Sequence, residues 1–382
     1  MPRSFIREIL KVAAQPDIIS FAGGLPHPDL FPVHELEEAF KRLIRDRGAE
    51  VLQYGPSEGF GPLREWVGER YRIRCGMEVS PDNVLITTGS QQGLDLVGKV
   101  FLDSTDFAAM ERPGYLGAIQ AFSYYSEAVI QVPLQGDGPD MNVLESTLRE
   151  KEPKLFYAIP NFQNPSGLSY SLEKRRQVAE LCQRYGTVLV EDDPYGELRF
   201  EGPDLACISS FRDCNGILLG TLSKIAAPGL RVGWMVAGGE DLENLLVAKQ
   251  AADLHTSTLT QQLAWQYLVT NDIDGHIEIL REAYRRQRDC MVRMIEKYFP
   301  PGIGFTQPEG GMFLWVTLPD GCSSLDLFEK AIERRVAYVP GAPFYVDGGG
   351  QNTMRLNFSN TSETEIEEGI RRLGACLEKH IR

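Results

Sequence analysis

Short apolar runs, each the length of a buried strand, recur through the first two thirds of this chain and alternate with amphipathic stretches of helical period. The expected strands lie at 83–87, 107–111, 128–132, 155–159, 188–191, 217–219 and 233–237. The expected helices that separate several of them lie at 91–101, 115–124 and 172–185. Strands that are apolar throughout are covered on both faces, and helices that alternate with such strands are typical of parallel sheets. The pattern predicts an α/β fold built on a mostly parallel sheet.

The pattern changes near residue 280. A long charged helix is expected over 277–293. After it come expected strands at 311–317, 336–339 and 354–358 and expected helices at 324–335 and 363–379. We therefore predict a large α/β domain over 46–280 and a smaller α+β domain over 281–382. The N-terminal segment 1–45 is rich in glycine and proline around 21–26 and is expected to pack with the small domain.

The charge of the chain argues against two classes of ligand. With 39 basic and 53 acidic residues, the formal net charge is −14, which repels the phosphates of nucleic acids and anionic lipids. The sequence contains no apolar run of membrane-spanning length and no signal-peptide pattern. Its seven cysteines are scattered, without a C-x-x-C pair or a zinc-like cluster, so we expect reduced thiols and no metal. These features predict a cytoplasmic protein that binds small molecules, with no nucleic-acid or membrane partner.

The segment 221–233 carries the most specific chemical signal. Lys224 follows two hydroxyl residues, Thr221 and Ser223, and Arg231 comes seven residues later. A lysine that reacts as an amine must be held on a structured turn with a lowered pKa. Hydroxyl and guanidinium groups suit a phosphate. The spacing favours a reactive amine beside an anion site, although a lone lysine is more often a solvated surface residue.

Further candidates follow expected strands, at the edge where parallel sheets collect their ligands. Asp192 and Tyr195 come at the end of one strand, where a buried carboxylate either meets a cation or caps the next helix. Asn164 lies in a turn and either donates to a ligand oxygen or only makes an Asx-turn. Ser90 and Gln91 open a helix, as part of an anion site or as a plain N-cap.

Two more side chains have a functional and a structural interpretation. Tyr115 either stacks on a flat heteroaromatic ring or belongs to the core. Arg355 alternates with apolar residues in an expected strand, a position that is usually at an exposed edge. Its planar guanidinium is nevertheless the group best matched to a carboxylate. Taken singly, none of these signals decides between its two interpretations.

The order of the candidates along the chain is more informative than any one of them. The chain resembles the fold-type I pyridoxal-phosphate (PLP) aminotransferases of class I and II in its succession of Ser90, Tyr115, Asn164, Asp192, Tyr195, Lys224, Arg231 and Arg355. The resemblance covers nearly the whole chain. It is strongest to the 2-aminoadipate and kynurenine aminotransferase branch, above all to the bacterial 2-aminoadipate aminotransferases of lysine biosynthesis, through FAGGLP at 21–26, QYGP at 53–56 and GGMFLW at 310–315.

The resemblance implies a role toward PLP for each candidate. Lys224 would bind the cofactor covalently and carry a proton between the substrate Cα and the cofactor C4′. Asp192 would keep the pyridine nitrogen protonated, Asn164 and Tyr195 would bind the ring O3′, and Tyr115 would stack on the ring. The implied phosphate ligands are Ser90, Gln91, Thr221, Ser223, Arg231 and, from the second subunit of a homodimer, Tyr54. The family often has serine at the position of Thr221, and either hydroxyl can donate to phosphate.

The resemblance also implies a substrate site. Arg355 would bind the α-carboxylate of the amino acid, with Asn164 and Gly24 beside it. Arg7 matches an arginine that binds the side-chain carboxylate in the nearest relatives. It is equally well a solvated residue of a terminal helix.

The implied activity is a ping-pong amino transfer of broad specificity. An L-amino acid of 2-aminoadipate, leucine or aromatic type would give its nitrogen to the cofactor, and 2-oxoglutarate would then take it. A PLP lyase on the same fold is a first alternative, which release of ammonia without an oxo acid would favour. A ligand-sensing domain like the aminotransferase-like half of bacterial transcription regulators is a second alternative, against which the net charge and the complete set of site residues argue.

Overall fold

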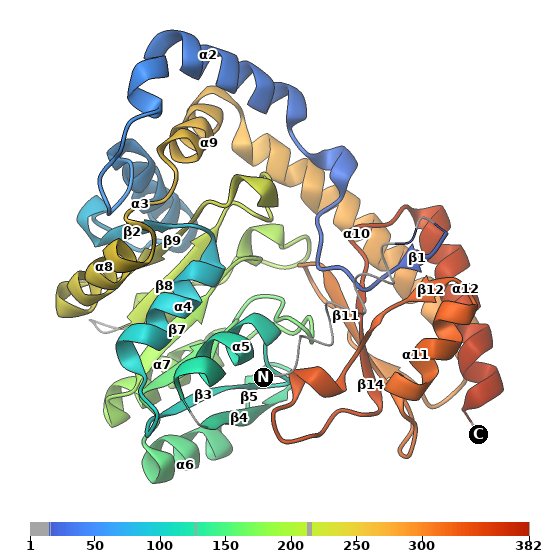
Figure 1. The fold of residues 1–382 in the computed structure, drawn as a ribbon. Helices are drawn as coiled ribbons and strands as arrows, with labels where there is room; N and C mark the ends of the chain where they lie inside the picture. The colour runs from blue at the N-terminus through green and yellow to red at the C-terminus, as the bar shows by residue number, and fades with distance from the viewer. Residues whose placement is uncertain (1–14, 16, 127, 212–215, 382) are drawn as a thin grey trace.

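A computed structural model describes residues 15, 17–126, 128–211 and 216–381 of the 382-residue chain (Figure 1). Its largest sheet has eight strands in the order β2-β9-β8-β7-β6-β3-β4-β5. Their bounds are Val84–Thr87 for β2, Phe107–Arg112 for β3, Ala128–Gln135 for β4, Gly138–Pro139 for β5, Leu155–Ala158 for β6, Val188–Asp192 for β7, Gly216–Thr221 for β8 and Gly233–Val236 for β9. All strands of this sheet except β9 and β5 run in the same direction. The predicted α/β fold with a mostly parallel sheet is confirmed.

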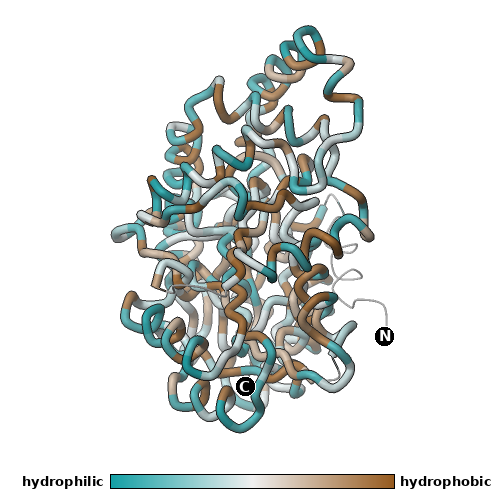
Figure 2. The backbone as a smooth tube through the Cα atoms, turned by 90° about the vertical axis from the view of Figure 1, so that its left-hand side faces the viewer, coloured by the Kyte–Doolittle hydropathy of each residue, from teal (hydrophilic) through white to brown (hydrophobic). Residues whose placement is uncertain are grey.

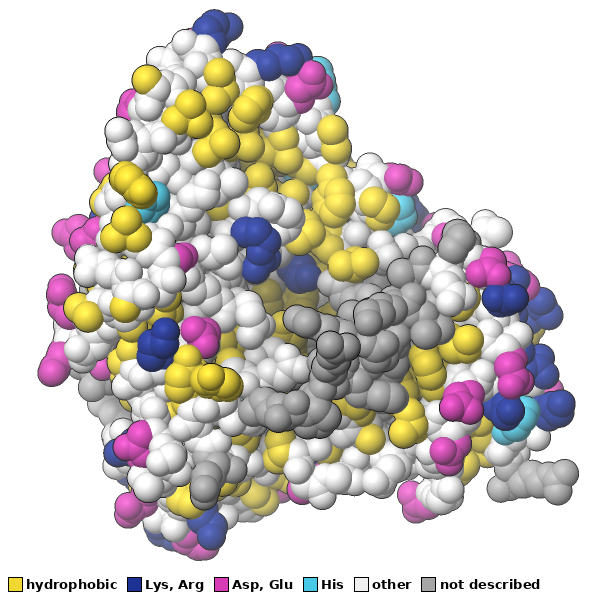
Figure 3. Space-filling model, in the orientation of Figure 1, with side chains coloured by type: hydrophobic (Ala, Val, Ile, Leu, Met, Phe, Trp, Pro, Cys, Tyr) yellow, Lys and Arg dark blue, Asp and Glu magenta, His cyan; other side chains and the backbone are white. Residues whose placement is uncertain are grey.

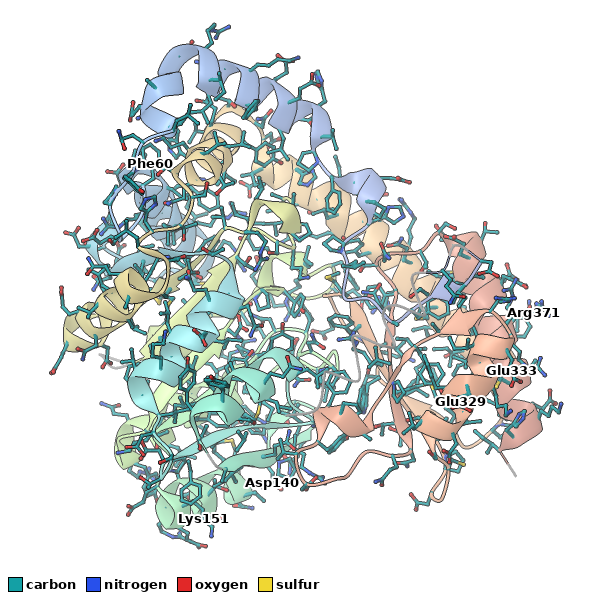
Figure 4. All side chains as sticks on the ribbon, in the orientation of Figure 1. Phe60, Asp140, Lys151, Glu329, Glu333 and Arg371 are labelled. Atoms are coloured by element: carbon teal, nitrogen blue, oxygen red, sulfur yellow. The ribbon has the colours of Figure 1, made fainter. Side chains whose placement is uncertain are left out.

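Helices cover both faces of this sheet, as the apolar strands predict. Alternate residues of β6 point to opposite faces, so Tyr157 joins one hydrophobic cluster and Phe156 joins the other. The first cluster includes α4 (Ser90–Phe101) and α5 (Leu116–Tyr125), and the second includes α6 (Met141–Lys151) and α7 (Leu172–Tyr185). Helix α6 begins where the Asp140 carboxylate accepts hydrogen bonds from two backbone N–H groups, and Figure 4 labels this cap and Lys151 at the other end.

The C-terminal part is a smaller α+β unit, drawn in orange and red in Figure 1. Its antiparallel sheet has the order β10-β11-β14-β13. The strands of this unit are β10 (Gly304–Phe305), β11 (Phe313–Thr317), β12 (Val336–Ala337), β13 (Val339–Pro340) and β14 (Thr353–Asn357). Its helices are α10 (Ile273–Tyr298), which continues from the large unit, α11 (Ser324–Glu333) and α12 (Glu363–His380). Helices α10 and α12 pack against each other.

The N-terminal residues contact both units. Strand β1 (Ile19–Ser20) pairs in parallel with β12, whereas α2 (Val33–Val51) packs on α9 (Thr258–Thr270). Helices α3 (Gly61–Cys75) and α8 (Gly239–Asp253) complete the large unit. The division of the chain at residues 45 and 280 stays a prediction.

Hydropathy follows this arrangement. In Figure 2 the hydrophobic segments gather in the middle of the molecule, and the outer helical turns alternate between hydrophilic and hydrophobic residues. Within the described part of the chain, no helix has the length and apolarity that a membrane crossing requires. Two clusters of buried hydrophobic residues cover the two faces of the sheet.

Candidate active site

A cavity of about 470 Å³ lies between the carboxyl ends of the large-sheet strands and the small sheet. Basic side chains gather at a hollow near the centre of the face drawn in Figure 3. The cavity lining includes these sequence-predicted residues: Gly24, Ser90, Gln91, Tyr115, Asn164, Asp192, Tyr195, Thr221, Ser223, Lys224, Arg231 and Arg355. The fold thus brings together residues that are up to 331 positions apart in the chain.

Lys224 lies in the turn that follows β8. Its Nζ donates a hydrogen bond to the Gly24 carbonyl over 3.0 Å and lies 6.0 Å from the centre of the Tyr195 ring. Burial, together with the positive charges of Arg355 and Arg231, lowers the pKa of Lys224 to about 8. A substantial fraction of the amine is therefore neutral near pH 8, which is the form that acts as a nucleophile or base.

Asp192 is the last residue of β7, and only 2% of it is exposed. Its Oδ2 accepts a hydrogen bond of 2.7 Å from the Tyr157 hydroxyl, whereas its buried Oδ1 has no hydrogen-bond partner. Burial raises the pKa of Asp192 to about 7; the Tyr157 hydrogen bond opposes this rise, and the charge of Asp193 contributes to it. A buried acceptor without a partner is costly, and a cationic N–H donor would satisfy it.

Arg355 and Asn164 form one wall of the cavity. Arg355 Nη1 donates to Asn164 Oδ1 over 2.8 Å, and Nη2 donates to a backbone carbonyl, that of Ala22, over 2.8 Å. Its Nε is buried without a partner, and its guanidinium carbon lies 4.3 Å from the centre of the Phe313 ring. Burial lowers the pKa of Arg355 to about 10. Asn164 Nδ2 in turn donates to the Tyr195 hydroxyl over 3.5 Å.

An anion cradle occupies the other end of the cavity. Helix α4 begins at Ser90 and its cap residue is Gly89, so no cap side chain covers the first N–H groups of the helix. The Thr221 hydroxyl lies 2.9 Å from that of Ser223. Arg231, at φ 52°, donates from Nη2 to the carbonyl of Thr88 just before α4, over 3.2 Å. Helix N–H groups, hydroxyls and a guanidinium are the donors that suit a phosphate.

Tyr115 and Gln91 line the cavity near the starts of two helices, whereas Tyr54 does not line it. Tyr115 is the N-cap of α5, and burial raises its pKa to about 12. Gln91 is exposed and donates to the Gly117 carbonyl over 3.1 Å. Tyr54 is 78% exposed, lies outside the cavity and meets the His255 ring edge-on at 5.7 Å between ring centres. Arg7 lies outside the described residues.

The sequence prediction of site residues did not include three buried residues whose contacts the structure reveals. Phe313 lines the cavity and packs on Arg355, and Tyr157 holds Asp192. The signal for Tyr157 was a hydroxyl inside an otherwise apolar strand. Lys249 on α8 is fully buried, and its Nζ donates to side chains of α4, α8 and the loop after α8. Nothing in the sequence distinguishes Lys249 from an exposed helical lysine.

Comparison with known proteins identifies the family. A profile of aminotransferase class I and II matches residues 17–373. The chain belongs to this family. Aromatic-amino-acid aminotransferase 1 of Thermococcus litoralis is 42% identical over 100% of this aminotransferase and 93% of the relative.

Two solved structures are similar over almost their whole length. The α-aminoadipate aminotransferase LysN of Thermus thermophilus, complexed with N-(5'-phosphopyridoxyl)-L-leucine, is 43% identical with a TM-score of 0.91, over 98% of this chain and 94% of that one. Kynurenine aminotransferase of Pyrococcus horikoshii, in complex with PMP, is 42% identical with a TM-score of 0.96, over 100% and 96%. These matches confirm the fold-type I resemblance and favour an aminotransferase over the lyase and ligand-sensing alternatives.

PLP is the cofactor of this aminotransferase. The residues of the cavity fit this cofactor in three respects: an acceptor for the ring nitrogen, donors for the phosphate and an amine for the covalent bond. Asp192 Oδ1 is a buried acceptor that lacks a donor, as a protonated pyridine nitrogen requires. The cradle around Ser90 and Arg231 has the donors that a phosphate requires, and Lys224 lies in the same cavity.

Proposed function

We propose that this aminotransferase moves the amino group of an L-amino acid of 2-aminoadipate, leucine or aromatic type to 2-oxoglutarate by a ping-pong mechanism. The observation that carries the proposal is one cavity that holds Lys224, with its lowered pKa, together with Asp192 and Arg355. The activities named for the similar proteins support the same classes of donor.

The roles proposed for the residues around PLP follow from their chemistry. Bound PLP supplies an electron sink for the electron pair that the substrate Cα releases. Asp192 holds the proton of the ring nitrogen, Asn164 and Tyr195 bind O3′, and Tyr115 stacks on the ring. Proposed to bind the phosphate are Ser90, Gln91, Thr221, Ser223 and Arg231.

Lys224 is proposed to act first as the covalent anchor and then as the base. Once the substrate amine has released it, its neutral amine takes the Cα proton and delivers it at C4′. Its pKa of about 8 supports this role, because a base with a pKa near the working pH transfers protons in both directions.

Specificity is proposed to be broad. Arg355 binds the α-carboxylate, beside Asn164 and Gly24. Of the described residues that line the cavity, only Lys224, Arg231 and Arg355 are cationic. Each of the three already has a proposed role at the cofactor or at the α-carboxylate. The described lining therefore favours substrates with apolar or aromatic side chains. For a second carboxylate, the proposed ligand is Arg7.

The proposal includes a homodimer in the cytoplasm. Tyr54 is exposed and lies outside the cavity of its own subunit, which supports a role at the phosphate of the second subunit. The scattered cysteines and the absence of a membrane-spanning helix among the described residues agree with this location.

Replacement of Lys224, the proposed covalent anchor, tests the proposed activity. The Lys224→Ala variant is expected to lose both half-reactions and the visible absorption of the covalently bound cofactor. Full turnover by that variant would overturn the assignment. In the unchanged enzyme, the loss of this absorption on addition of single amino acids, without an oxo acid, identifies the preferred donor.

A further inference from the structure

Tyr157 is a buried hydroxyl residue that the proposed mechanism does not use. It lies on β6, paired with Val190 of the neighbouring strand β7, and none of its surface is exposed. Asp192 ends β7 two residues later, and the Tyr157 hydroxyl reaches its Oδ2 over 2.7 Å. Two adjacent parallel strands therefore fix the donor and the acceptor relative to each other.

We propose that Tyr157 is a positioning residue for Asp192: it takes up one carboxylate oxygen and leaves Oδ1 as the acceptor that holds the protonated ring nitrogen of the cofactor. This inference rests on the proposed function. Its geometric basis is the difference between the two oxygens, since Oδ2 has a donor and the buried Oδ1 has none.

Packing fixes the tyrosine ring itself. Phe122 of α5 meets it edge-on, with 5.7 Å between the ring centres, inside the first hydrophobic cluster. The ring therefore cannot swing away when the cavity fills, and the hydroxyl stays at the carboxylate. Tyr115, which is proposed to stack on the cofactor, is the N-cap of this same helix α5. The helix that packs on Tyr157 therefore also positions Tyr115.

The surroundings of Asp192 show why its carboxylate needs a hydrogen-bond donor to stay ionised. Burial raises the pKa of Asp192, as does the neighbouring Asp193, and the Tyr157 hydroxyl is the group that lowers it. The phenol remains a donor, because burial and the charge of Asp192 raise its own pKa, with Tyr115 and Glu111 acting in the same direction. Without this hydroxyl the proton shifts from the ring nitrogen toward the carboxylate, and the ion pair weakens.

The test is a comparison of two cofactors in two variants. Tyr157→Phe keeps the ring and removes the hydroxyl. Tyr338→Phe is the matched control, because its buried hydroxyl donates to the Ser324 carbonyl in the small unit, away from the cavity. Apoproteins are titrated with PLP and with a PLP analogue that has carbon in place of the ring nitrogen. The dissociation constant is followed by quenching of tryptophan fluorescence, and thermal unfolding of each apoprotein reports folding separately.

We expect Tyr157→Phe to weaken PLP binding about tenfold or more, the range of a hydrogen bond to a charged group, and to change analogue binding less than about twofold. Tyr338→Phe is expected to change neither. Equal weakening for both cofactors, or no weakening for PLP, would overturn the inference. Failure of the unchanged apoprotein to bind PLP would instead overturn the proposed function.

A second readout follows the proton. With ¹⁵N in the cofactor ring, the nitrogen resonance is expected to lose its protonated position at a lower pH in Tyr157→Phe than in the unchanged protein and in Tyr338→Phe. A purely structural role for Tyr157 leaves that titration where it was. An unshifted titration in a folded, PLP-bound variant therefore also overturns the inference.

Discussion

Arg355 Nη1 donates a hydrogen bond to Asn164 Oδ1 over 2.8 Å, and this contact joins the two units of the molecule at the cavity. Arg355 comes from β14 of the small sheet, and Asn164 comes from the loop after β6 of the large sheet. The guanidinium keeps one buried N–H group, Nε, without a partner. Arg355 is therefore already held in place before a carboxylate arrives, which lowers the entropy cost of binding.

The first prediction concerns this arginine. Arg355→Lys keeps the charge and loses the planar pair of donors, so kcat/KM for an L-amino acid should fall by about 10- to 100-fold, the value of one to two charge-assisted hydrogen bonds. The measurement is the single-turnover half-reaction with leucine. As a control, the corresponding amine without a carboxylate should react equally slowly with both proteins. A fall of equal size for that amine would show that the variant damages the cofactor site instead.

The second prediction uses the pKa of Lys224, which is about 8 in the fold. About a tenth of the amine is neutral at pH 7 and about half at pH 8. The rate at which apoprotein captures PLP covalently, measured by borohydride reduction and mass spectrometry, should rise about fivefold between these pH values and level off above pH 9. A rate that continues to rise tenfold per pH unit up to pH 10 would contradict the lowered pKa.

The same shift determines a stability change. The folded pKa of Lys224 lies below its unfolded value, so the unfolded chain binds more protons between about pH 8 and 10.4. The destabilising effect of the lysine is complete below pH 8 and disappears as the pH rises through this window. The apoprotein of Lys224→Met should therefore be more stable than the unchanged apoprotein at pH 7, by a margin that shrinks by pH 10. The free energies of unfolding of the two apoproteins are measured in urea. A difference between them that does not change with pH would contradict the lowered pKa of Lys224.

The sequence was sufficient for the parts of the site that lie at strand ends. Asp192 ends a strand, and Lys224 and Asn164 each follow one. The apolar runs reveal these strands, and parallel strands bring such ends to one edge. Tyr157 and Lys249 could not be found in this way, because their roles depend on partners in other elements. A local pattern shows where a residue lies on its own strand or helix and does not show which residue it meets.

The next prediction concerns the anion cradle. A Cβ on Gly89, at φ 75°, would lie 2.5 Å from Arg231 Nη2, so Gly89→Ala should displace the guanidinium. We expect PLP to bind at least about 30-fold more weakly, while pyridoxal, which lacks the phosphate, loses less than about threefold. Gly186→Ala is the matched control, because Gly186 has φ 66° and nothing within 4 Å of its Cβ position. Equal losses for PLP and pyridoxal would contradict a phosphate role for Arg231.

Another prediction concerns two cysteines. The Cys207 thiol, 1% exposed, lies 2.9 Å from the sulfur of the partly exposed Cys75 at the end of α3. This hydrogen bond and the charge of Arg74 lower the pKa of Cys75. A hydroperoxide should oxidise the Cys75 thiolate to a sulfenic acid with release of water or an alcohol, and Cys207 should then displace water to form a disulfide.

Peptide mass spectrometry should find the cross-linked pair, with the loss of two titratable thiols. The cross-link should be absent from Cys207→Ser and present in the control Cys376→Ser. Oxidation of Cys75 to the sulfinic acid while Cys207 stays reduced would refute the prediction.

The last prediction concerns Tyr54, whose 78% exposure outside its own cavity requires a second subunit if it binds phosphate. Lys224→Ala and Tyr54→Ala chains with different tags are expressed together, and the heterodimer is isolated. Its Tyr54→Ala subunit keeps Lys224 and receives an intact Tyr54 from the other chain, so one complete site forms. We expect about half the activity of the unchanged dimer, with PLP affinity restored at that site. If the Tyr54→Ala homodimer is impaired and the heterodimer has no more than half of that low activity, Tyr54 acts within its own subunit, because the only site that keeps Lys224 then lacks the tyrosine it needs. A Tyr54→Ala homodimer as active as the unchanged dimer would show that Tyr54 has no role at the phosphate.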